Sequence, residues 1–296
     1  MKNITVIGAG TMGNGIAHIF AMHNYEVILV DVSEQALEKA IEIIDKNLWR
    51  MVAKEKISEE DKTETIGKIT TSTNLKEAVS QADLIVEAAT EHEETKLNIF
   101  RQMDEFSPSD CILASNTSSI SITKIASVTN KPEKVIGMHF MNPVPVMKLV
   151  EVIRGYATSD DVTSKIMEIA KKLNKIPVEV NDYPGFVANR ILMPMINEAI
   201  YALYENVAGV EEIDTVMKLG MAHPMGPLQL ADFIGLDVCL AILEVLKDGF
   251  GNPKYAACPL LIKMVTAGKL GRKSGEGFYK YEKGSKDLVV ASTFVK

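Results

Sequence analysis

The chain has 296 residues, a formal net charge of −7 at pH 7 and 47% hydrophobic residues. At about 150 residues per domain, this length predicts two domains, and the ordinary globular composition excludes disordered, collagen-like and coiled-coil proteins. The acidic balance repels phosphate backbones, so no nucleic-acid partner is expected.

The beginning of the chain predicts a β–α–β unit. Residues 4–8 and 26–32 are β-branched runs typical of buried strands, and residues 11–24 between them have helical spacing. Two parallel strands joined by a right-handed crossover are expected. Residues 33–68 are charged and helical, begin with a good N-cap in Ser33, and are too long for a plain crossover. We expect them to form an inserted helical hairpin that projects from the sheet.

Strands and helices then alternate. A helix is predicted over residues 160–173, and strands near residues 69–71, 82–88, 111–115, 134–140, 148–155 and 176–180. This alternation favours an α/β fold with a doubly wound, Rossmann-type, mainly parallel sheet. The polar pair before Pro184–Gly185 is the clearest boundary signal. The sequence therefore predicts one domain over residues 1–182 and another over residues 183–296.

The second domain is predicted to be all-helical. Helical periodicity runs through most of it, and the first convincing strand is the short segment 278–281. Methionine and aliphatic residues at helical spacing, such as Met193 and Ile196, are typical of a core. The last residues, 284–296, are expected to form a poorly packed extension.

A glycine-rich loop follows the first predicted strand. Gly8, Gly10 and Gly13 fit the pattern G-x-G-x-x-G between a strand and a helix. The first glycine permits a tight turn, the second lets the backbone approach a pyrophosphate, and the third allows close helix–strand contact. With Thr11 and Met12, they predict a dinucleotide site at a helix N-terminus, which favours an anion.

Asp31 ends the second predicted strand, about 20 residues beyond the glycines. A carboxylate there accepts both ribose hydroxyls and repels a 2′-phosphate, so the sequence predicts NAD rather than NADP. The alternative is a glycine turn with an incidental aspartate.

One histidine is placed for acid–base chemistry. An enzyme that oxidises an alcohol needs a group to take the hydroxyl proton, and histidine suits this task near neutral pH. His139 closes a predicted strand at the carboxyl edge, where such sheets bind ligands, and Glu151 lies in the next strand. A carboxylate would fix the imidazole tautomer and stabilise its charged form. The alternative is a purely structural histidine.

Residues 114–121, ASNTSSIS, follow the preceding strand at the same edge. Their amide and hydroxyls are suited to holding a substrate oxygen or a nicotinamide amide. A hydrogen-bonded turn or helix cap is the alternative interpretation.

The three cysteines are far apart and odd in number, so neither a disulfide framework nor a thiolate metal site is expected. Free thiols suit a reducing cytoplasm. The sequence has no apolar stretch of about 18 residues that would span a bilayer, and no secretory cleavage pattern. We expect a cytoplasmic protein without a metal or a membrane partner.

Six motifs occur in a fixed order: GAGTMGNGIA, VEAATEHEETK, ASNTSSISI, GMHFMNPVPVMKLVEVIRG, DYPGFVANR and GKLGRKSGEGFYKY. From Lys2 to about Tyr281, this set resembles the 3-hydroxyacyl-CoA dehydrogenase family, and most closely its bacterial 3-hydroxybutyryl-CoA members. The resemblance implies an NAD-binding domain, a helical dimerisation domain that forms a homodimer, and NAD-dependent interconversion of a short (S)-3-hydroxyacyl-CoA and its 3-ketoacyl-CoA. One departure is Met141, where many members carry a second aromatic residue.

The resemblance also implies residue roles. His139 resembles the catalytic base and Glu151 its paired carboxylate. Ser118 resembles the residue that contacts the substrate oxygen, and Asn189 the second-domain amide that completes the site. Three further positions resemble residues at the NAD site, and these are Glu91, Lys96 and Asn116.

An acyl-CoA substrate needs basic groups for its phosphates. Arg50, Lys54 and Lys56 on the predicted hairpin are candidates, with a solvated helix face as the alternative. The run Lys269–Lys273 is a weaker candidate that is equally suited to holding the C-terminal tail.

Two other functions remain open at this point. A dehydrogenase of free 3-hydroxyacids would generally use a catalytic lysine, whereas His139 and Glu151 favour the thioester. An inactive NAD-binding protein on the same fold is the second, because fold does not imply function.

Overall fold

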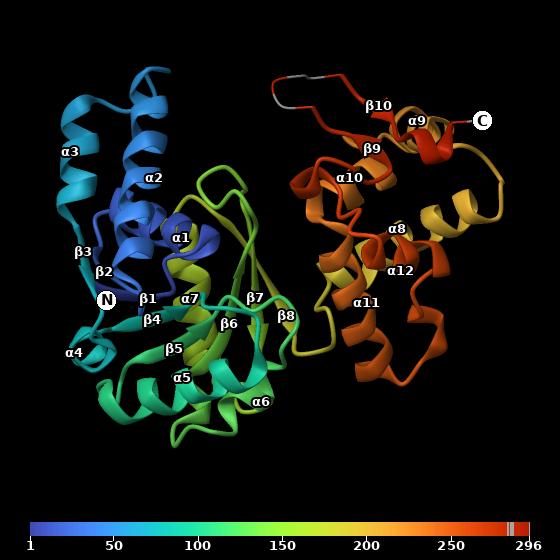
Figure 1. The fold of residues 1–296 in the computed structure, drawn as a ribbon. Helices are drawn as coiled ribbons and strands as arrows, with labels where there is room; N and C mark the ends of the chain where they lie inside the picture. The colour runs from blue at the N-terminus through green and yellow to red at the C-terminus, as the bar shows by residue number, and fades with distance from the viewer. Residues whose placement is uncertain (283, 285–286, 296) are drawn as a thin grey trace. The chain divides into compact units, whose positions relative to one another are not determined.

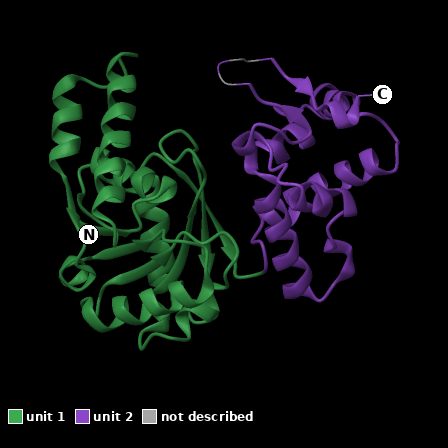
Figure 2. Cartoon of the chain, in the orientation of Figure 1, with its two compact units in different colours: residues 1–183 green, residues 184–296 purple. Residues whose placement is uncertain are grey.

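The computed structural model describes residues 1–282, 284 and 287–295. The chain forms two compact units, Met1–Tyr183 and Pro184–Lys296 (Figure 2). Each unit has its own hydrophobic core, built from its own residues.

The first unit is built on an eight-stranded sheet with the strand order β3-β2-β1-β4-β5-β6-β7-β8 (Figure 1). All neighbouring strands pair in parallel except β6 and β7, which are antiparallel. The strands are β1 (Asn3–Ile7), β2 (Glu26–Val30), β3 (Ile69–Ser72), β4 (Leu84–Glu87), β5 (Ile112–Ser115), β6 (Val135–Phe140), β7 (Leu149–Arg154) and β8 (Ile176–Asn181). The predicted doubly wound, mainly parallel sheet is confirmed.

Helices cover the sheet, and one pair forms the predicted hairpin. They are α1 (Thr11–Met22), α2 (Glu34–Val52), α3 (Glu59–Gly67), α4 (Leu75–Val79), α5 (Glu93–Phe106), α6 (Ile122–Ala126) and α7 (Asp160–Lys172), with a 3-10 turn at Pro132–Lys134. Helices α2 and α3 lie side by side and extend beyond the sheet (Figure 1). Ser33 caps α2 as predicted, and Ser58 forms a capping box with Asp61 at the start of α3.

The central strands are buried on both faces, which explains their continuous apolar sequences. Every residue of β4, β5 and β6 is buried, whereas the edge strands β3 and β8 are largely exposed. The parallel strands therefore bring the loops that follow them to one edge of a rigid sheet, where open α/β sheets bind ligands.

The second unit is helical, as predicted, apart from one small hairpin. Its helices are α8 (Ala188–Tyr204), α9 (Val210–Gly220), α10 (Pro227–Ile234), α11 (Leu236–Phe250) and α12 (Pro259–Thr266), with 3-10 turns at Pro253–Tyr255, Arg272–Ser274 and Ser292–Phe294. Strands β9 (Tyr279–Lys280) and β10 (Val289–Val290) pair antiparallel. Within the described residues of the whole chain, no helix has both the length and the apolar character needed to cross a membrane.

The predicted C-terminal extension is largely exposed over its described part, with Val289 56% and Val295 65% exposed, but a few of its residues pack. Val289 and Val290 form β10, Ala291 is fully buried, and the Phe294 ring lies 5.7 Å from that of Phe278. Residues 285, 286 and 296 of this expectation lie outside the described residues. These few residues of the extension pack against Phe278 and its neighbours, which are anchored by groups far away in the sequence.

Two buried aspartates provide that anchor. Asp232 accepts hydrogen bonds from the backbone N–H groups of Phe278 (3.0 Å) and Tyr279 (2.9 Å) and from the Tyr281 hydroxyl (3.1 Å). Asp214 accepts one from the Tyr279 hydroxyl at 2.8 Å. Both carboxylates are 1% exposed, so the end of the chain supplies donors that these buried charges require.

Candidate site at the carboxyl edge of the sheet

The glycine loop joins β1 to α1 and leaves room for a ligand at one position. Gly8 has φ +99°, and a Cβ there would lie 2.6 Å from the carbonyl oxygen of Ala88. A Cβ on Gly13 would lie 1.6 Å from the carbonyl oxygen of Gly8. A Cβ on Gly10, the N-cap of α1, would meet nothing within 4 Å. The loop therefore fits a pyrophosphate at the helix N-terminus, with open space where the backbone must be approached.

Asp31 follows β2 and is fixed against this loop. Its Oδ2 accepts a hydrogen bond from the backbone N–H of Ala9 at 2.8 Å, and its Oδ1 accepts one from Ser33 at 3.0 Å. An ionised carboxylate has about four acceptor sites, so these two bonds orient the group and leave capacity for ribose hydroxyls.

His139 and Glu151 lie directly opposite each other on the antiparallel strands β6 and β7. The ring Nδ1 of His139 lies 2.8 Å from Oε2 of Glu151. The two residues are 8% and 2% exposed, so the pair is shielded from bulk water. In a neutral ring this carboxylate favours the tautomer with its proton on Nδ1 and its lone pair on Nε2.

Asn116 links the strand ends around this pair. Its Oδ1 accepts a hydrogen bond from the backbone N–H of Phe140 at 2.9 Å, and its own N–H donates to the carbonyl of Glu87 at 2.7 Å. The loop that follows β5 is thus attached to the strand that carries His139.

Glu91 anchors the rest of the β5–α6 loop through a single oxygen. Five donors converge on its Oε1: the Thr117 hydroxyl at 2.6 Å, the Ser118 and Ser119 N–H groups at 2.9 and 3.1 Å, the Ser119 hydroxyl at 2.9 Å and the Ser118 hydroxyl at 3.3 Å. Burial works to raise the pKa of the Glu91 carboxyl, but Lys96 and the hydroxyl and amide donors outweigh it and lower that pKa. The ionised form is therefore favoured.

Lys96 and Glu87 lie beneath this loop. The Lys96 ammonium is 2.7 Å from Glu87 Oε1 and 3.3 Å from Glu91 Oε2. Lys96 is 1% exposed and Glu87 is fully buried. Sequence reasoning singled out Lys96 and Glu91 but missed Glu87. The available signal was a carboxylate at the end of an otherwise apolar buried strand, which requires a partner.

The remaining predicted site residues lie on or beside two helices, α8 and α2. Asn189 lies in the second unit, in the first turn of α8, where its N–H donates to Gly185. Arg50 is on α2 and donates to Asn47, and Lys54 follows that helix.

The weaker basic candidates already have partners in the second unit. Lys269 pairs with Glu276 at 2.6 Å, and Lys273 pairs with Asp237 at 2.5 Å. These contacts support the alternative that the Lys269–Lys273 run is structural.

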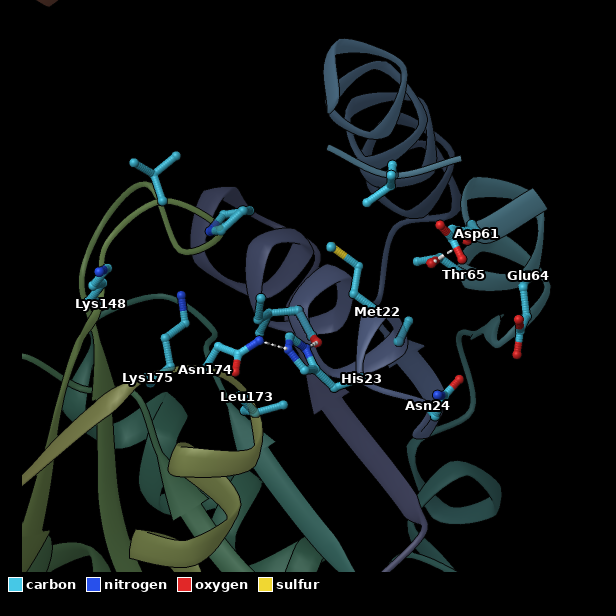
Figure 3. A pocket seen from close by; sticks show the side chains of 15 residues that line it. Met22, His23, Asn24, Asp61, Glu64, Thr65, Lys148, Leu173, Asn174 and Lys175 are labelled. Carbon is cyan, nitrogen blue, oxygen red and sulfur yellow. Dashed lines mark hydrogen bonds between the residues drawn. The ribbon is translucent and has the colours of Figure 1, made fainter. Parts of the chain in front are cut away.

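A separate cavity of about 550 Å³ lies elsewhere in the first unit, between the end of α1, α3 and the loop that follows β6 (Figure 3). In its wall the Asn174 side-chain amide donates to Nε2 of His23 at 3.0 Å. Lys175 donates to the carbonyl groups of Val144 and Met147, and so holds the loop between β6 and β7. None of the predicted site residues is among the described residues that line this cavity.

Comparison with known proteins accounts for both units. Residues 3–183 match the family described as "3-hydroxyacyl-CoA dehydrogenase, NAD binding domain", and residues 185–281 match "3-hydroxyacyl-CoA dehydrogenase, C-terminal domain". The chain is 56% identical over 282 residues to a Bacillus subtilis (strain 168) protein named "Probable 3-hydroxybutyryl-CoA dehydrogenase", covering 95% of this chain and 98% of the relative. A Bradyrhizobium diazoefficiens "3-hydroxybutyryl-CoA dehydrogenase" is 51% identical, covering 97% of this chain and 98% of the relative.

Solved structures agree with the sequence relatives. The crystal structure of (S)-3-hydroxybutyryl-CoA dehydrogenase from Ralstonia eutropha has a TM-score of 0.93 to this chain at 49% identity, covering 96% of this chain and 100% of that one. The resemblance carried by the sequence motifs is confirmed, and NAD is the dinucleotide that the first unit takes. One family thus accounts for both units, and the chain belongs to the NAD-dependent 3-hydroxyacyl-CoA dehydrogenases.

Proposed function

We propose that this protein interconverts (S)-3-hydroxybutyryl-CoA and acetoacetyl-CoA, with NAD as the redox partner. The observation that carries the proposal is the buried His139–Glu151 pair, with 2.8 Å between Nδ1 and Oε2, in the sheet that also carries the glycine loop. The short acyl chain is inferred from the names of relatives at 56% and 49% identity.

In this proposal the first domain, residues 1–182, holds the cofactor. Backbone N–H groups of the loop Gly8–Gly13, including Thr11 and Met12, hold the pyrophosphate, and Asp31 accepts the ribose hydroxyls. Asn116, Glu91 and Lys96 support the nicotinamide end. When bound, NAD supplies the hydride acceptor for oxidation at C3, and NADH supplies the hydride donor for reduction.

His139 acts as the general base and general acid for the proton of the C3 hydroxyl. In the oxidation direction its Nε2 removes the proton of the C3 hydroxyl, and in reduction it returns that proton to the C3 oxygen. Glu151 accepts the Nδ1 hydrogen bond in both directions and stabilises the imidazolium that forms. A buried carboxylate does this more effectively than an exposed one, because water does not screen the pair.

Ser118 and Asn189 hold the substrate oxygens. The Ser118 hydroxyl donates to the C3 oxygen as its negative charge develops, and the Asn189 amide, from the second domain, holds the C3 or thioester oxygen. Glu91 Oε1 accepts from the Ser118 N–H at 2.9 Å and lies 3.3 Å from the Ser118 hydroxyl, which supports a fixed position for this residue beside the site.

Partners follow from the same proposal. Arg50 and Lys54 provide positive charge for the CoA phosphates. The second domain, residues 183–296, forms a homodimer. Its Val216, Leu219 and Met221 are 60%, 82% and 60% exposed, which favours burial against a second copy. We place the protein in the cytoplasm, because its three cysteines are free and buried.

The test is oxidation of NADH by purified protein with acetoacetyl-CoA, followed by absorbance, with NADPH and with free acetoacetate in parallel. Rapid turnover with NADH and the CoA ester, and much slower turnover in the other two reactions, is expected. Activity with free acetoacetate alone would replace this proposal by the free-acid alternative. NADH binding without turnover of any 3-ketoacyl substrate would favour the inactive alternative.

A further inference from the structure

Glu87 is a charged group inside the sheet that the proposed mechanism does not use. It is the last residue of β4 and is fully buried. Three donors satisfy its carboxylate: the Lys96 ammonium at 2.7 Å, the Ser115 hydroxyl at 2.7 Å and the backbone N–H of Ala89 at 2.8 Å. Burial of a carboxylate is unfavourable, and an apolar residue would fill a strand end without this requirement. Its place at the ligand-binding edge suggests a role beyond packing.

Lys96 lies between Glu87 and Glu91 and contacts both carboxylates. An ammonium has three protons, and three acceptors surround that of Lys96: Glu87 Oε1 at 2.7 Å, Glu91 Oε2 at 3.3 Å and the Ala89 carbonyl at 3.3 Å. Since Lys96 is 1% exposed, its protons point to groups of the protein. The three side chains form a row of alternating charge that ends at Glu91.

The far end of this row holds the Ser118 loop. Glu91 uses Oε2 for Lys96 and Oε1 for the N–H groups and hydroxyls of Ser118 and Ser119. Removal of the Lys96 charge, or of the Glu87 charge that orients it, removes the anchor of Glu91 Oε2 and leaves the carboxylate held through Oε1 alone.

Ser115 provides a second connection from Glu87 to the same loop. Its hydroxyl has one proton, which it donates to Glu87 Oε2 at 2.7 Å. The hydroxyl oxygen then accepts the backbone N–H of Thr117 at 3.2 Å. Two separate hydrogen-bonded paths therefore run from one carboxylate to three consecutive residues.

We propose that Glu87 is a positioning residue that fixes the loop Thr117–Ser119, through Lys96 and Glu91 on one side and through Ser115 on the other. The link from this loop to the reaction rests on the proposed function, which assigns the Ser118 hydroxyl to the substrate oxygen. The link from Glu87 to the loop rests on the contacts alone.

The first experiment measures amide hydrogen exchange of the intact protein, wild type against Glu87→Gln. Glutamine keeps the shape and removes the charge, so we expect exchange at Thr117, Ser118 and Ser119 to become at least about tenfold faster. The matched control is Glu179→Gln, in the same sheet, whose carboxylate pairs with Arg154 at 3.2 Å and is 46% exposed. Exchange at the loop stays unchanged in this control. Equal exchange in wild type and Glu87→Gln overturns the proposal.

The second experiment tests the route through Glu91. In a Glu91→Gln background the Ser118 and Ser119 amides have already lost their ionised acceptor, so adding Glu87→Gln changes their exchange less than about twofold. If the exchange rates of the Ser118 and Ser119 amides in the double variant rise by the product of the two single-variant factors, the route through Glu91 is contradicted. Should Glu87→Gln not fold, Ser115→Ala removes only the hydroxyl on the other path. It must accelerate exchange at Thr117, and unchanged exchange there overturns the proposal.

Kinetics connect the loop to the reaction. Glu87→Gln is expected to lower kcat for acetoacetyl-CoA reduction at least about tenfold while KM changes less than about threefold, because the Ser118 contact strengthens in the transition state. Wild-type protein that does not turn over acetoacetyl-CoA refutes the proposed function and leaves the exchange result intact. An active wild type whose kcat and exchange are both unmoved by Glu87→Gln refutes the positioning role alone.

Discussion

Glu151 faces His139 across the antiparallel pair β6–β7, and its Oε2 lies 2.8 Å from the imidazole Nδ1. Glu151→Gln keeps an acceptor for the Nδ1–H and removes the negative charge that stabilises the imidazolium. We expect kcat for acetoacetyl-CoA reduction to fall by about 10²-fold or more, within the range ascribed to acid–base catalysis. The measurement is steady-state NADH oxidation. Glu179→Gln, on the neighbouring strand β8, retains full activity, and an equal loss in both variants would contradict the role of the pair.

Asp31 is expected to set the cofactor preference. Asp31→Asn keeps an acceptor for the Ala9 N–H and removes the charge that repels a 2′-phosphate. The ratio of kcat/KM with NADH to that with NADPH should fall by about tenfold or more, mainly through better use of NADPH. Glu34→Gln, which also removes one charge at the start of α2, serves as the control. If both variants change the ratio equally, net charge rather than the Asp31 carboxylate sets the preference.

Two glycines of the loop should respond oppositely to alanine. Gly13→Ala places a Cβ 1.6 Å from the Gly8 carbonyl oxygen, and we expect it to prevent folding. Gly10→Ala meets no atom within 4 Å, so its cost in stability is at most about 1 kcal/mol, the scale of an N-cap change. Its methyl group instead fills the space reserved for the pyrophosphate, and NADH affinity falls by about tenfold or more. Thermal melts and NADH fluorescence titrations distinguish the two effects. Normal NADH binding by the Gly10→Ala variant would contradict the assignment of the pyrophosphate to this position.

His18 should make the first unit sensitive to acid. It is fully buried in α1, and burial, aided by the positive charge of Lys175, lowers its pKa to about 4. Between its ordinary pKa and about 4 the unfolded state binds more protons, so stability is present at neutral pH and is lost as pH falls through this window. The loss reaches about 3 kcal/mol below pH 4. His18→Leu should abolish most of this slope in urea unfolding of the first unit, and an unchanged slope would assign it to other groups.

Asp232 should give the second unit the opposite response. Burial, aided by the charge of Asp214, raises the pKa of Asp232 to about 6 against the hydrogen bonds it accepts. The folded state then binds more protons between about pH 6 and its ordinary pKa, so stability increases as pH falls through this window, by up to about 3 kcal/mol. Hydrogen exchange resolved by residue separates the two units in one sample. Protection of the second-unit core that declines from pH 7 to 5, after correction for intrinsic exchange rates, would contradict this sign.

Much of the fold and part of the site could be predicted because their signals are local. The glycine loop lies between a strand and a helix. The hairpin of α2 and α3 could be predicted because its segment is too long for a plain crossover and begins with the N-cap Ser33. His139 and Glu151 are twelve positions apart on consecutive strands, so their meeting depends only on the register of one antiparallel pair.

Sequence reasoning missed the burial of Lys96 against Glu87 and the packing of the chain's end, and both depend on tertiary contacts. Lys96 lies in the run EHEETK, which is typical of a solvated helix start, yet it is almost completely buried because Glu87 draws it under the loop. The packing of the chain's end depends on Asp232, which is 46 positions away from Phe278. Neither relationship has a periodicity or a spacing that a single sequence displays.

Asp214 and Asp232 of the second unit also affect how the two units fold during synthesis of the chain. All eight strands of the first unit are complete by residue 183, so this unit has its whole core while the second is still being made. The second unit is different, because the described donors to Asp232 come from Phe278, Tyr279 and Tyr281, near the end of the chain. Tyr279 adds a donor to Asp214, which also accepts from Leu228 and Gln229. We expect ribosome-bound chains halted some 40 residues short of the end to display a protease-resistant first unit and an unfolded second one. Premature termination would therefore release a cofactor domain without its helical partner, rather than an enzyme with a shortened tail.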